Sequence, residues 1–357
     1  MNLLKQLDWK LNFAVLFIIA ASLTSLISTA PALFHKQLTW LAFGLILLFL
    51  ITRFDWRPFI SYRGVILVFY LLSIVFLLAA YFLAPSIRGT RGWLFLGPFQ
   101  FQVSEFAKLS LIIFYAYFFS RKHIGIARFS NLISSFVYFV IPGALVVLQP
   151  DLGSGLILFC LWFGFLLVSG IRLKHLIIAL IIFAIAGIII WQGILHDYQK
   201  ERILGFFFPG RDPLGINYSV IQSKIAIGSA GLFGKGFGQG TQVQLGFLPE
   251  AQTDFIFAAF IEEWGLLMGF LLIAAFFIII LRIIKIGLGV DNNFGRFVCL
   301  GTVILFSVQF LLNVGSNLGL TPVIGLTFPF FSYGGSSLLT NFILLGIIQS
   351  IFIRRSL

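Results

Sequence analysis

The sequence contains ten long apolar runs separated by short polar or basic connections. A helix that crosses a membrane needs about 20 mostly apolar residues, and these runs are close to that length. Only 10% of the residues are charged, whereas soluble domains carry about 25%. This composition excludes a soluble enzyme and predicts an all-α polytopic membrane protein, with residues 1–357 forming one integral membrane domain. The predicted spans are residues 11–30, 37–52, 64–84, 103–120, 132–148, 152–171, 175–195, 255–281, 297–320 and 336–353.

Basic residues between the runs predict the orientation of the chain. Fifteen Lys and Arg residues lie in connections on the side of the N-terminus, and only Lys36, Arg88 and Arg91 lie in the short connections on the other side. Basic loops stay in the cytoplasm, so both termini are expected there. The first run lacks a small-residue cleavage site and is expected to remain as a span. The net charge of +12 thus comes mostly from basic residues that set the orientation of the spans. They form no basic domain that could bind a nucleic-acid duplex, so no nucleic-acid partner is expected.

One connection is much longer than the others. Residues 196–254 lie between the seventh and eighth runs and are expected to form a large extracytoplasmic loop. Its aromatic and apolar stretches favour short amphipathic helices at the membrane surface. Its glycine-rich part, residues 228–240, resembles a phosphate-binding loop. However, no strand precedes it and no Lys-Ser or Lys-Thr pair closes it, so a flexible loop is the better interpretation.

Four ionisable residues interrupt the apolar runs: Glu105, Lys108, Glu262 and Glu263. A charge at the centre of a span costs roughly 2.5 to 3.5 kcal/mol on insertion scales, so such residues usually have a partner or a function. Glu105 and Lys108 are three residues apart in the fourth run and share one helical face. They can form a structural ion pair, or they can face a cavity and hold a polar ligand.

Asp254 stands at the outer mouth of the eighth run. If a helix starts there, Glu262 lies roughly 12 Å deeper in the membrane and about 80° around the helix axis. A carboxylate at this position can cap the helix, or it can serve as a base for a substrate held at the level of the lipid headgroups. In the uncharged connection between the last two runs, Ser332 and Ser336 can cap the tenth helix or help to bind an anion.

A series of short motifs runs through the chain: Arg91-Gly92-Trp93, Glu105 with Lys108, Gln149-Pro150-Asp151-Leu152-Gly153-Ser154, Asp212-Pro213, Asn217-Tyr218, Gln222-Ser223, residues 231–240, Pro249-Glu250, Thr253-Asp254-Phe255, Glu262-Glu263 and residues 329–336. Together and in this order, they resemble the SEDS (shape, elongation, division and sporulation) family over nearly the whole chain. The rod-shape branch, RodA, is more similar than the division branch, FtsW.

The resemblance implies a peptidoglycan glycosyltransferase of the bacterial cytoplasmic (inner) membrane. Such an enzyme polymerises lipid II, the undecaprenyl-pyrophosphoryl disaccharide-pentapeptide, into nascent glycan during cell-wall elongation. It works with a class B penicillin-binding protein, the transpeptidase that cross-links the new strands. By position and by family match, Asp254 is the candidate general base that takes the proton from the attacking sugar hydroxyl.

The diphosphate leaving group needs stabilisation of its negative charge by cations or by a metal ion, and a divalent cation is the one cofactor that this chemistry suggests. The candidate basic residues on or near the outer side are Arg88, Arg91, Lys108, Arg202, Arg211 and Lys224. The other candidate substrate-binding residues are Glu105, Asp151, Glu262, Ser332 and Ser336.

Two other functions fit the same topology: a lipid II flippase and a non-catalytic scaffold for a transpeptidase. A flippase needs polar groups through the whole depth of the membrane, whereas the candidate base lies at the outer surface beside a loop that can cover a substrate. No internal repeat is visible, which also disfavours an inverted-repeat transporter. We therefore expect an outward-open cavity between the fourth, fifth and eighth spans, lined by Glu105, Lys108 and Asp254.

Overall fold

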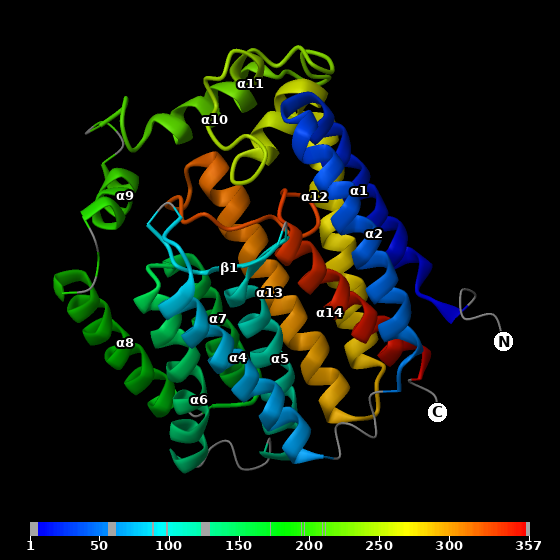
Figure 1. The fold of residues 1–357 in the computed structure, drawn as a ribbon, viewed down its shortest axis with the longest axis vertical. Coiled ribbons are helices and arrows are strands. Elements are labelled where there is room, and N and C mark those ends of the chain that lie inside the picture. Colours follow the sequence, from blue (N-terminus) through cyan, green and yellow to red (C-terminus); the bar gives the residue numbers. More distant parts are fainter. Residues whose placement is uncertain are drawn as a thin grey trace.

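The computed structural model describes residues 6–55, 62–87, 89–97, 99–122, 129–171, 173–193, 195, 197–208, 210 and 212–354. Within these residues, ten helices coincide with the ten predicted spans (Figure 1). They are α1 (Trp9–Thr29), α2 (Pro31–Arg53), α4 (Arg63–Leu83), α5 (Val103–Lys122), α6 (Phe129–Leu148), α7 (Leu152–Val168), α8 (Leu173–Gly193), α12 (Ile256–Leu288), α13 (Asn293–Leu318) and α14 (Gly335–Ile353).

Nine of these ten helices in the described residues are long and apolar enough to cross a membrane. The exception, α7, has 17 residues. At 1.5 Å per residue it is about 26 Å long, near the lower limit for a span. The predicted polytopic, mainly helical fold is confirmed.

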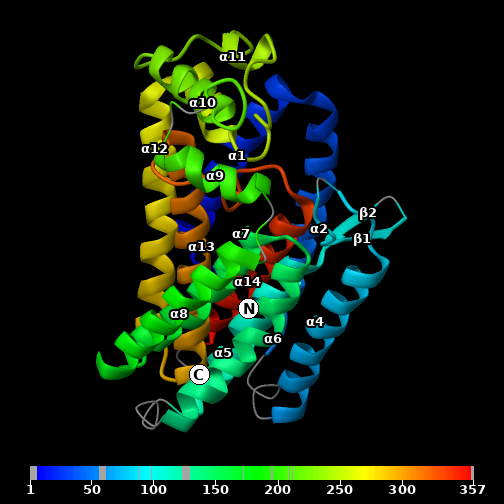
Figure 2. The ribbon, with the colours of Figure 1, turned by 90° about the vertical axis from the view of Figure 1, so that its left-hand side faces the viewer.

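The helices differ in how much of their surface the protein buries. In the most apolar stretch of α5, 83% of the residues are buried, against 11% in α2 and 7% in α8. Helix α8 stands at the outside of the bundle in both ribbon views (Figures 1 and 2). Exposed isoleucines such as Ile181 and Ile185 are typical of a helix that faces lipid. The polar residues in the first half of α5, in contrast, are buried: Ser104, Glu105, Lys108 and Ser110.

The long loop forms three short helices, as predicted: α9 (Asp197–Phe207), α10 (Tyr218–Ser229) and α11 (Thr241–Gln244). They arch over one end of the bundle, and both chain ends lie away from this arch (Figures 1 and 2). The loop end is called the outer end below. Its placement outside the cytoplasm remains a prediction from the basic residues.

Helix α12 is broken near its outer end. Gly265 has φ +85° and ψ 171°, and its surroundings leave no room for a side chain, because a Cβ atom there would overlap the Leu232 carbonyl. The loop supplies the hydrogen bonds that the break leaves open: Lys235 N donates to Glu262 O (2.9 Å) and Leu266 N donates to Gly231 O (3.0 Å). Residues 266–288 alone are long enough to span the membrane.

This break corrects the predicted eighth span, residues 255–281. Asp254 lies in a turn, and Glu262 lies before the break, in contact with the outer loop. Glu262 is therefore not a charge about 12 Å deep on one continuous span. The sequence analysis treated the segment as one helix because its apolar residues continue without interruption across Gly265.

A short β-hairpin was not predicted. Strands β1 (Trp93–Leu96) and β2 (Phe99–Gln102) pair antiparallel, with Trp93 opposite Gln102 and Leu96 opposite Phe99. The hairpin lies next to the outer ends of α4 and α5 (Figure 2). Gln102 N donates to Ser336 Oγ (3.0 Å), and Ser336 Oγ donates to Gln100 O (3.2 Å), so the first turn of α14 holds the second strand.

Candidate active site

Asp254 lies in the turn that precedes α12 and is partly exposed. Phe255 occupies the N-cap position of α12, which has no side-chain cap hydrogen bond. The residue at the N-cap is thus Phe255, and Asp254 lies one residue before it. Its carboxylate borders Gly325, where a Cβ atom would lie 3.8 Å from Asp254 Oδ2.

The backbone around Asp254 is fixed by amide side chains of α13. Asn317 Nδ2 (2.8 Å) and Asn313 Nδ2 (3.1 Å) both donate to the Asp254 carbonyl oxygen. Asn317 Oδ1 accepts from Ala258 N (3.1 Å), in the first turn of α12. These two buried amides, four residues apart in an apolar helix, thus position the turn. The sequence analysis missed them, although polar pairs at this spacing inside a span are a usable signal.

The connection between α13 and α14 holds the same turn from another side. Ser332 Oγ donates to Thr253 O (2.7 Å) and accepts from Phe328 N (2.9 Å). Tyr333 N donates to Gln252 O (3.0 Å), so three consecutive carbonyls, those of residues 252, 253 and 254, have donors from outside the turn. Burial raises the pKa of the Tyr333 hydroxyl, which therefore stays protonated. The observed contacts of Ser332 make it a positioning residue.

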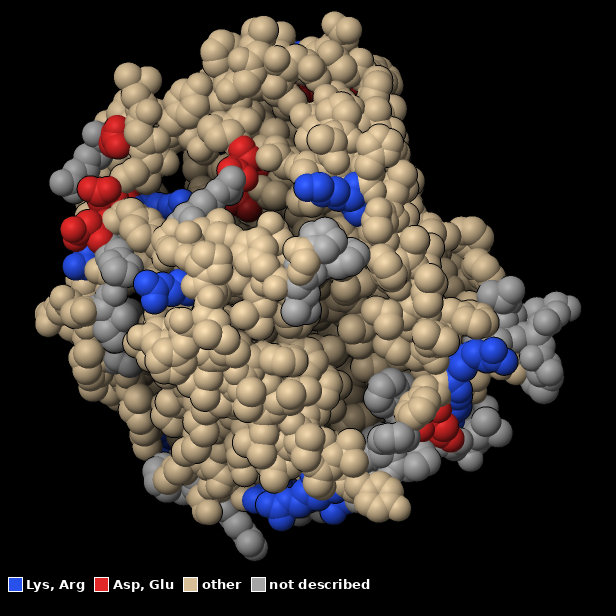
Figure 3. All heavy atoms as spheres, viewed as in Figure 1, with Lys and Arg blue, Asp and Glu red and all other residues tan. Residues whose placement is uncertain are grey.

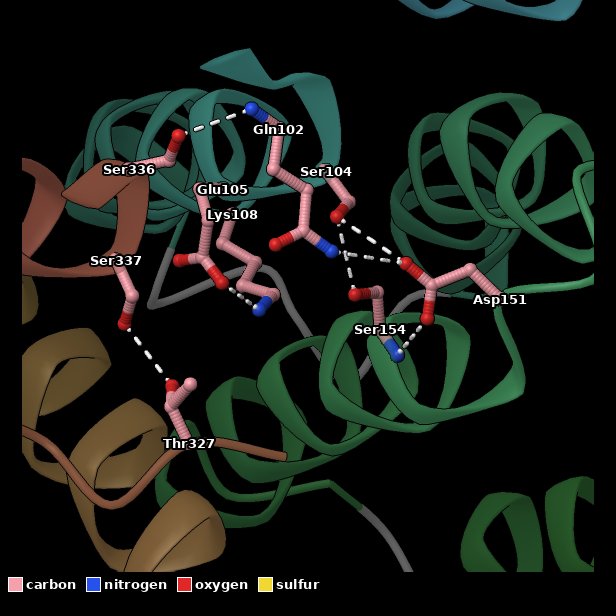
Figure 4. A network of polar contacts seen from close by, with 9 residues as sticks. All are labelled: Gln102, Ser104, Glu105, Lys108, Asp151, Ser154, Thr327, Ser336 and Ser337. Carbon is pink, nitrogen blue, oxygen red and sulfur yellow. Dashed lines mark hydrogen bonds and ion pairs between the residues drawn. The ribbon is translucent and has the colours of Figure 1, made fainter. Parts of the chain in front are cut away.

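Glu105 and Lys108 form an ion pair inside the bundle. Lys108 Nζ lies 2.7 Å from Glu105 Oε1, and the two residues are 1% and 3% exposed, respectively. Figure 4 shows both side chains projecting from α5 toward the space between α7 and the start of α14. Mutual neutralisation allows such burial. Because Asp254 is partly exposed and this pair is sealed, the three residues do not line one open cavity as expected.

Asp151 is the N-cap of α7. Its Oδ1 accepts from Ser154 N (3.0 Å), and its Oδ2 accepts from Ser104 Oγ (3.3 Å) and Gln102 Nε2 (3.4 Å). This network connects α5, α7 and the hairpin (Figure 4). Asp151 is partly exposed, so its carboxylate remains a candidate for contacts with a polar ligand.

One segment lies against both Asp254 and the start of α7. In residues 324–327, Gly325 borders Asp254, and the Ile324 carbonyl oxygen would lie 2.7 Å from a Cβ atom at Gly153, two residues after Asp151. Thr327 Oγ1 and Ser337 Oγ are 3.0 Å apart (Figure 4). The segment therefore packs against the Asp254 turn, the start of α7 and the start of α14.

Glu262 anchors the outer loop. Its buried Oε1 accepts from Lys235 Nζ (2.7 Å), Gln242 N (3.0 Å) and Thr241 Oγ1 (3.2 Å). The glycine-rich run is thus ordered against α12 at this point. Lys235 was not among the candidate cations, although it was visible as the one charge within that run.

The predicted cations are found in different surroundings. Arg202 and Lys224 line one pocket between α9, α10 and the outer end of α13. Arg91 is exposed, and its backbone N donates to Gln149 O (3.3 Å). Arg88 and Arg211 lie outside the described residues.

Figure 3 shows a hollow below the arch of the loop helices, with acidic side chains in it and basic side chains on both sides.

Comparisons with known proteins agree with this architecture. The chain is 35% identical over 330 residues to the peptidoglycan glycosyltransferase MrdB of Escherichia coli strain K12, covering 90% of this chain and 86% of MrdB. It is 35% identical to stage V sporulation protein E of Bacillus subtilis strain 168 (88% of this chain, 86% of that protein). It is 34% identical to the probable peptidoglycan glycosyltransferase FtsW of Coxiella burnetii (89% and 86%).

Solved structures show the same fold. One, described as the structural coordination of polymerization and crosslinking by a peptidoglycan synthase complex, contains a chain with a TM-score of 0.82 and 32% identity, covering 98% of both chains. The rod shape determining protein RodA of Thermus thermophilus gives a TM-score of 0.73 at 28% identity, also covering 98% of both chains. The family model for FtsW, RodA and SpoVE, described as cell cycle proteins, matches residues 2–356. The chain therefore belongs to the FtsW/RodA/SpoVE family.

Proposed function

We propose that this multi-pass protein of the bacterial cytoplasmic membrane is a peptidoglycan glycosyltransferase that polymerises lipid II, with Asp254 as its general base. The names of the relatives support the reaction. The observation that carries the role of Asp254 is its position: a partly exposed carboxylate at the outer end, on a turn whose carbonyls are held by α13 and by the connection before α14.

The reaction requires one proton transfer and one displacement. Asp254 takes the proton of the attacking sugar hydroxyl while the hydroxyl oxygen forms a bond to the anomeric carbon of the lipid-linked chain. The bond between that carbon and the diphosphate oxygen breaks, and the lipid diphosphate leaves with the electron pair. A single displacement inverts the anomeric centre, so an α-linked donor gives a β-linked glycan. A fixed turn suits this role because a base must be in place before the transition state forms.

A divalent cation fits these residues only if the protein and the substrate phosphates coordinate it together. The described residues contain no group of three or more His, Cys, Asp or Glu side chains that could hold a metal by themselves. Magnesium commonly uses one or two carboxylates together with substrate phosphates. Asp151, partly exposed and beside the Ser104 and Ser154 hydroxyls, is the carboxylate that would hold such an ion, which would neutralise the diphosphate.

A class B penicillin-binding protein is the proposed partner. The related solved complex is described as one that coordinates polymerization with crosslinking. A transpeptidase that joins peptide stems of new strands would supply the second activity.

Polymerisation of lipid II in detergent tests the function. Purified protein is incubated with labelled lipid II in micelles, which have no leaflets, and the products are separated by size. We expect glycan polymer. A lipid II flippase or a scaffold would leave the lipid II unchanged, and that result, with folded protein and the transpeptidase partner present, would overturn the proposal.

A further inference from the structure

We propose that the pocket lined by Arg202 and Lys224 binds the diphosphate group of a lipid-linked substrate. This inference rests on the proposed function and adds a location for one of its substrates. The pocket lies between α9, α10 and the residues that follow α13, and its lining includes Asn217, Ser219 and Thr321.

Charge favours an anion here. The lining contains two cations and no carboxylate. Four other cations within the described residues form ion pairs: Lys108 with Glu105, Lys235 with Glu262, Arg282 with Asp8 and Arg354 with Asp55. Arg202 and Lys224 form no ion pair with any described carboxylate. Two unpaired cations on one pocket are a suitable receptor for a diphosphate, which carries several acceptor oxygens.

The remainder of the lining favours a lipid over a free phosphate. Beside the two cations and the three neutral polar residues, the pocket wall is apolar, with Phe206, Ile216, Val220, Ile221, Pro322 and Val323. Phe207 and Leu214, near the pocket in sequence, expose large apolar surfaces, 67% and 86%. A polyprenyl diphosphate combines the two properties that these surfaces match: a charged group and an apolar chain.

The pocket is structurally connected to the candidate base. Ser223 Oγ, adjacent in sequence to Lys224, donates to Asn317 O (2.8 Å), and Asn317 Nδ2 donates to Asp254 O (2.8 Å). On the other side, the pocket residue Val323 is two residues from Gly325, which borders the Asp254 carboxylate. The pocket and the Asp254 turn are therefore held by the same end of α13 and by the same connection that follows it.

The fold also fixes Lys224. Its ammonium group lies over Gly319, the left-handed residue (φ +71°) that ends α13, and a Cβ atom there would overlap the Lys224 side chain. A cation at a helix C-terminus is favoured by the helix dipole, so the lysine is held in place before a ligand arrives. A capping role alone would leave diphosphate affinity unaffected by the charge of Lys224.

Binding of undecaprenyl diphosphate to the detergent-solubilised full-length protein tests the proposal. We expect Arg202→Gln and Lys224→Gln each to weaken binding roughly 10-fold, as loss of a charge-assisted hydrogen bond does. Arg202→Lys and Lys224→Arg should retain most of the affinity. The matched control is Lys200→Gln, which removes a charge from the same helix α9 but not from the pocket lining, and it should bind like the wild type.

Two competitors distinguish the sources of the phosphate. Inorganic pyrophosphate that binds as tightly as the lipid would indicate a free-phosphate site, and equal competition by phosphatidylglycerol would indicate a general anionic-lipid site. Either result would overturn the proposal, as would wild-type affinity in both Gln variants. Asp254→Asn should bind undecaprenyl diphosphate like the wild type. Binding therefore tests the pocket, whereas polymerisation tests Asp254 as the base, and either proposal can fail without the other.

Discussion

Two acidic groups near the outer end of this protein are held in opposite ways. Glu105 is sealed inside the bundle, and its charge is cancelled by Lys108 at 2.7 Å. Asp254 is partly exposed, and the hydrogen bonds from Asn313 and Asn317 reach its backbone carbonyl. The protein holds Glu105 through its side chain, whereas the bonds from Asn313 and Asn317 hold the backbone at Asp254.

The difference separates a structural carboxylate from a reactive one. In the buried pair the two charges neutralise each other, and both side chains are out of reach of a substrate hydroxyl. The turn that carries Asp254 is instead held through its backbone carbonyls, so the position of the carboxylate is set before a substrate arrives. The following substitutions test this contrast, beginning with the largest effect.

Replacing Asp254 with Asn should lower the rate of lipid II polymerisation about 10² to 10⁴-fold, the range typical of a lost general base. The backbone contacts of the turn do not depend on the carboxylate, so the melting temperature should stay near that of the wild type. The measurement is the initial rate in detergent at equal concentrations of folded protein. A rate within a few-fold of the wild type would remove Asp254 from its role.

Single replacements in the buried pair should mainly affect stability. Glu105→Gln or Lys108→Met leaves one charge buried without its partner, at a cost of about 3–5 kcal/mol, whereas the double variant leaves none and should be milder. Thermal unfolding of the solubilised protein compares the three variants. If the double variant has the lowest polymerisation rate at normal stability, the pair contacts substrate, and the contrast with Asp254 fails.

Asn317→Leu should reduce the polymerisation rate roughly 10-fold, because the Asp254 carbonyl and Ala258 N lose a partner worth about 1–3 kcal/mol. Gln309→Leu is the matched control in the same helix. Gln309 is equally buried, but its side-chain atoms have no hydrogen-bond partner among the described residues. Its replacement should leave the rate unchanged. Equal effects of the two variants would show that Asn317 acts through helix packing.

Ser336→Ala should have the smallest effect, about 1 kcal/mol of unfolding free energy, since it removes the link between α14 and the hairpin but leaves Asp254 untouched. Thermal unfolding and the polymerisation rate together check this. A loss of rate larger than the loss of stability would place Ser336 at the substrate, as the sequence analysis expected.

The sequence predicted the spans because hydrophobicity over about 20 residues is a property of composition alone. It also placed Asp254 at the outer end and paired Glu105 with Lys108, since both conclusions need only local helix geometry. The break at Gly265 was missed because its φ of +85° depends on Leu232 and Gly234, more than 30 residues away in the chain. No local pattern around Gly265 reports that contact.

The support of the candidate base was missed for a similar reason. Asn313 and Asn317 lie about 60 residues beyond Asp254, and only the packing of α13 against α12 brings their amides to its carbonyl. Glu262 was assigned to the membrane because its partner, Lys235, belongs to a glycine-rich loop that gave no sign of folding back. Long-range contacts of irregular segments thus account for most of what the sequence did not predict.

The most direct measurement of the central claim is the effect of formate on polymerisation by Asp254→Ala. Truncation removes the carboxylate and leaves space for a small external one, which can take the proton in its place. We expect the residual rate to rise with formate concentration, while the wild-type rate does not respond. A variant that binds lipid II, has a low rate and gains nothing from formate would contradict the account of Asp254 as the base.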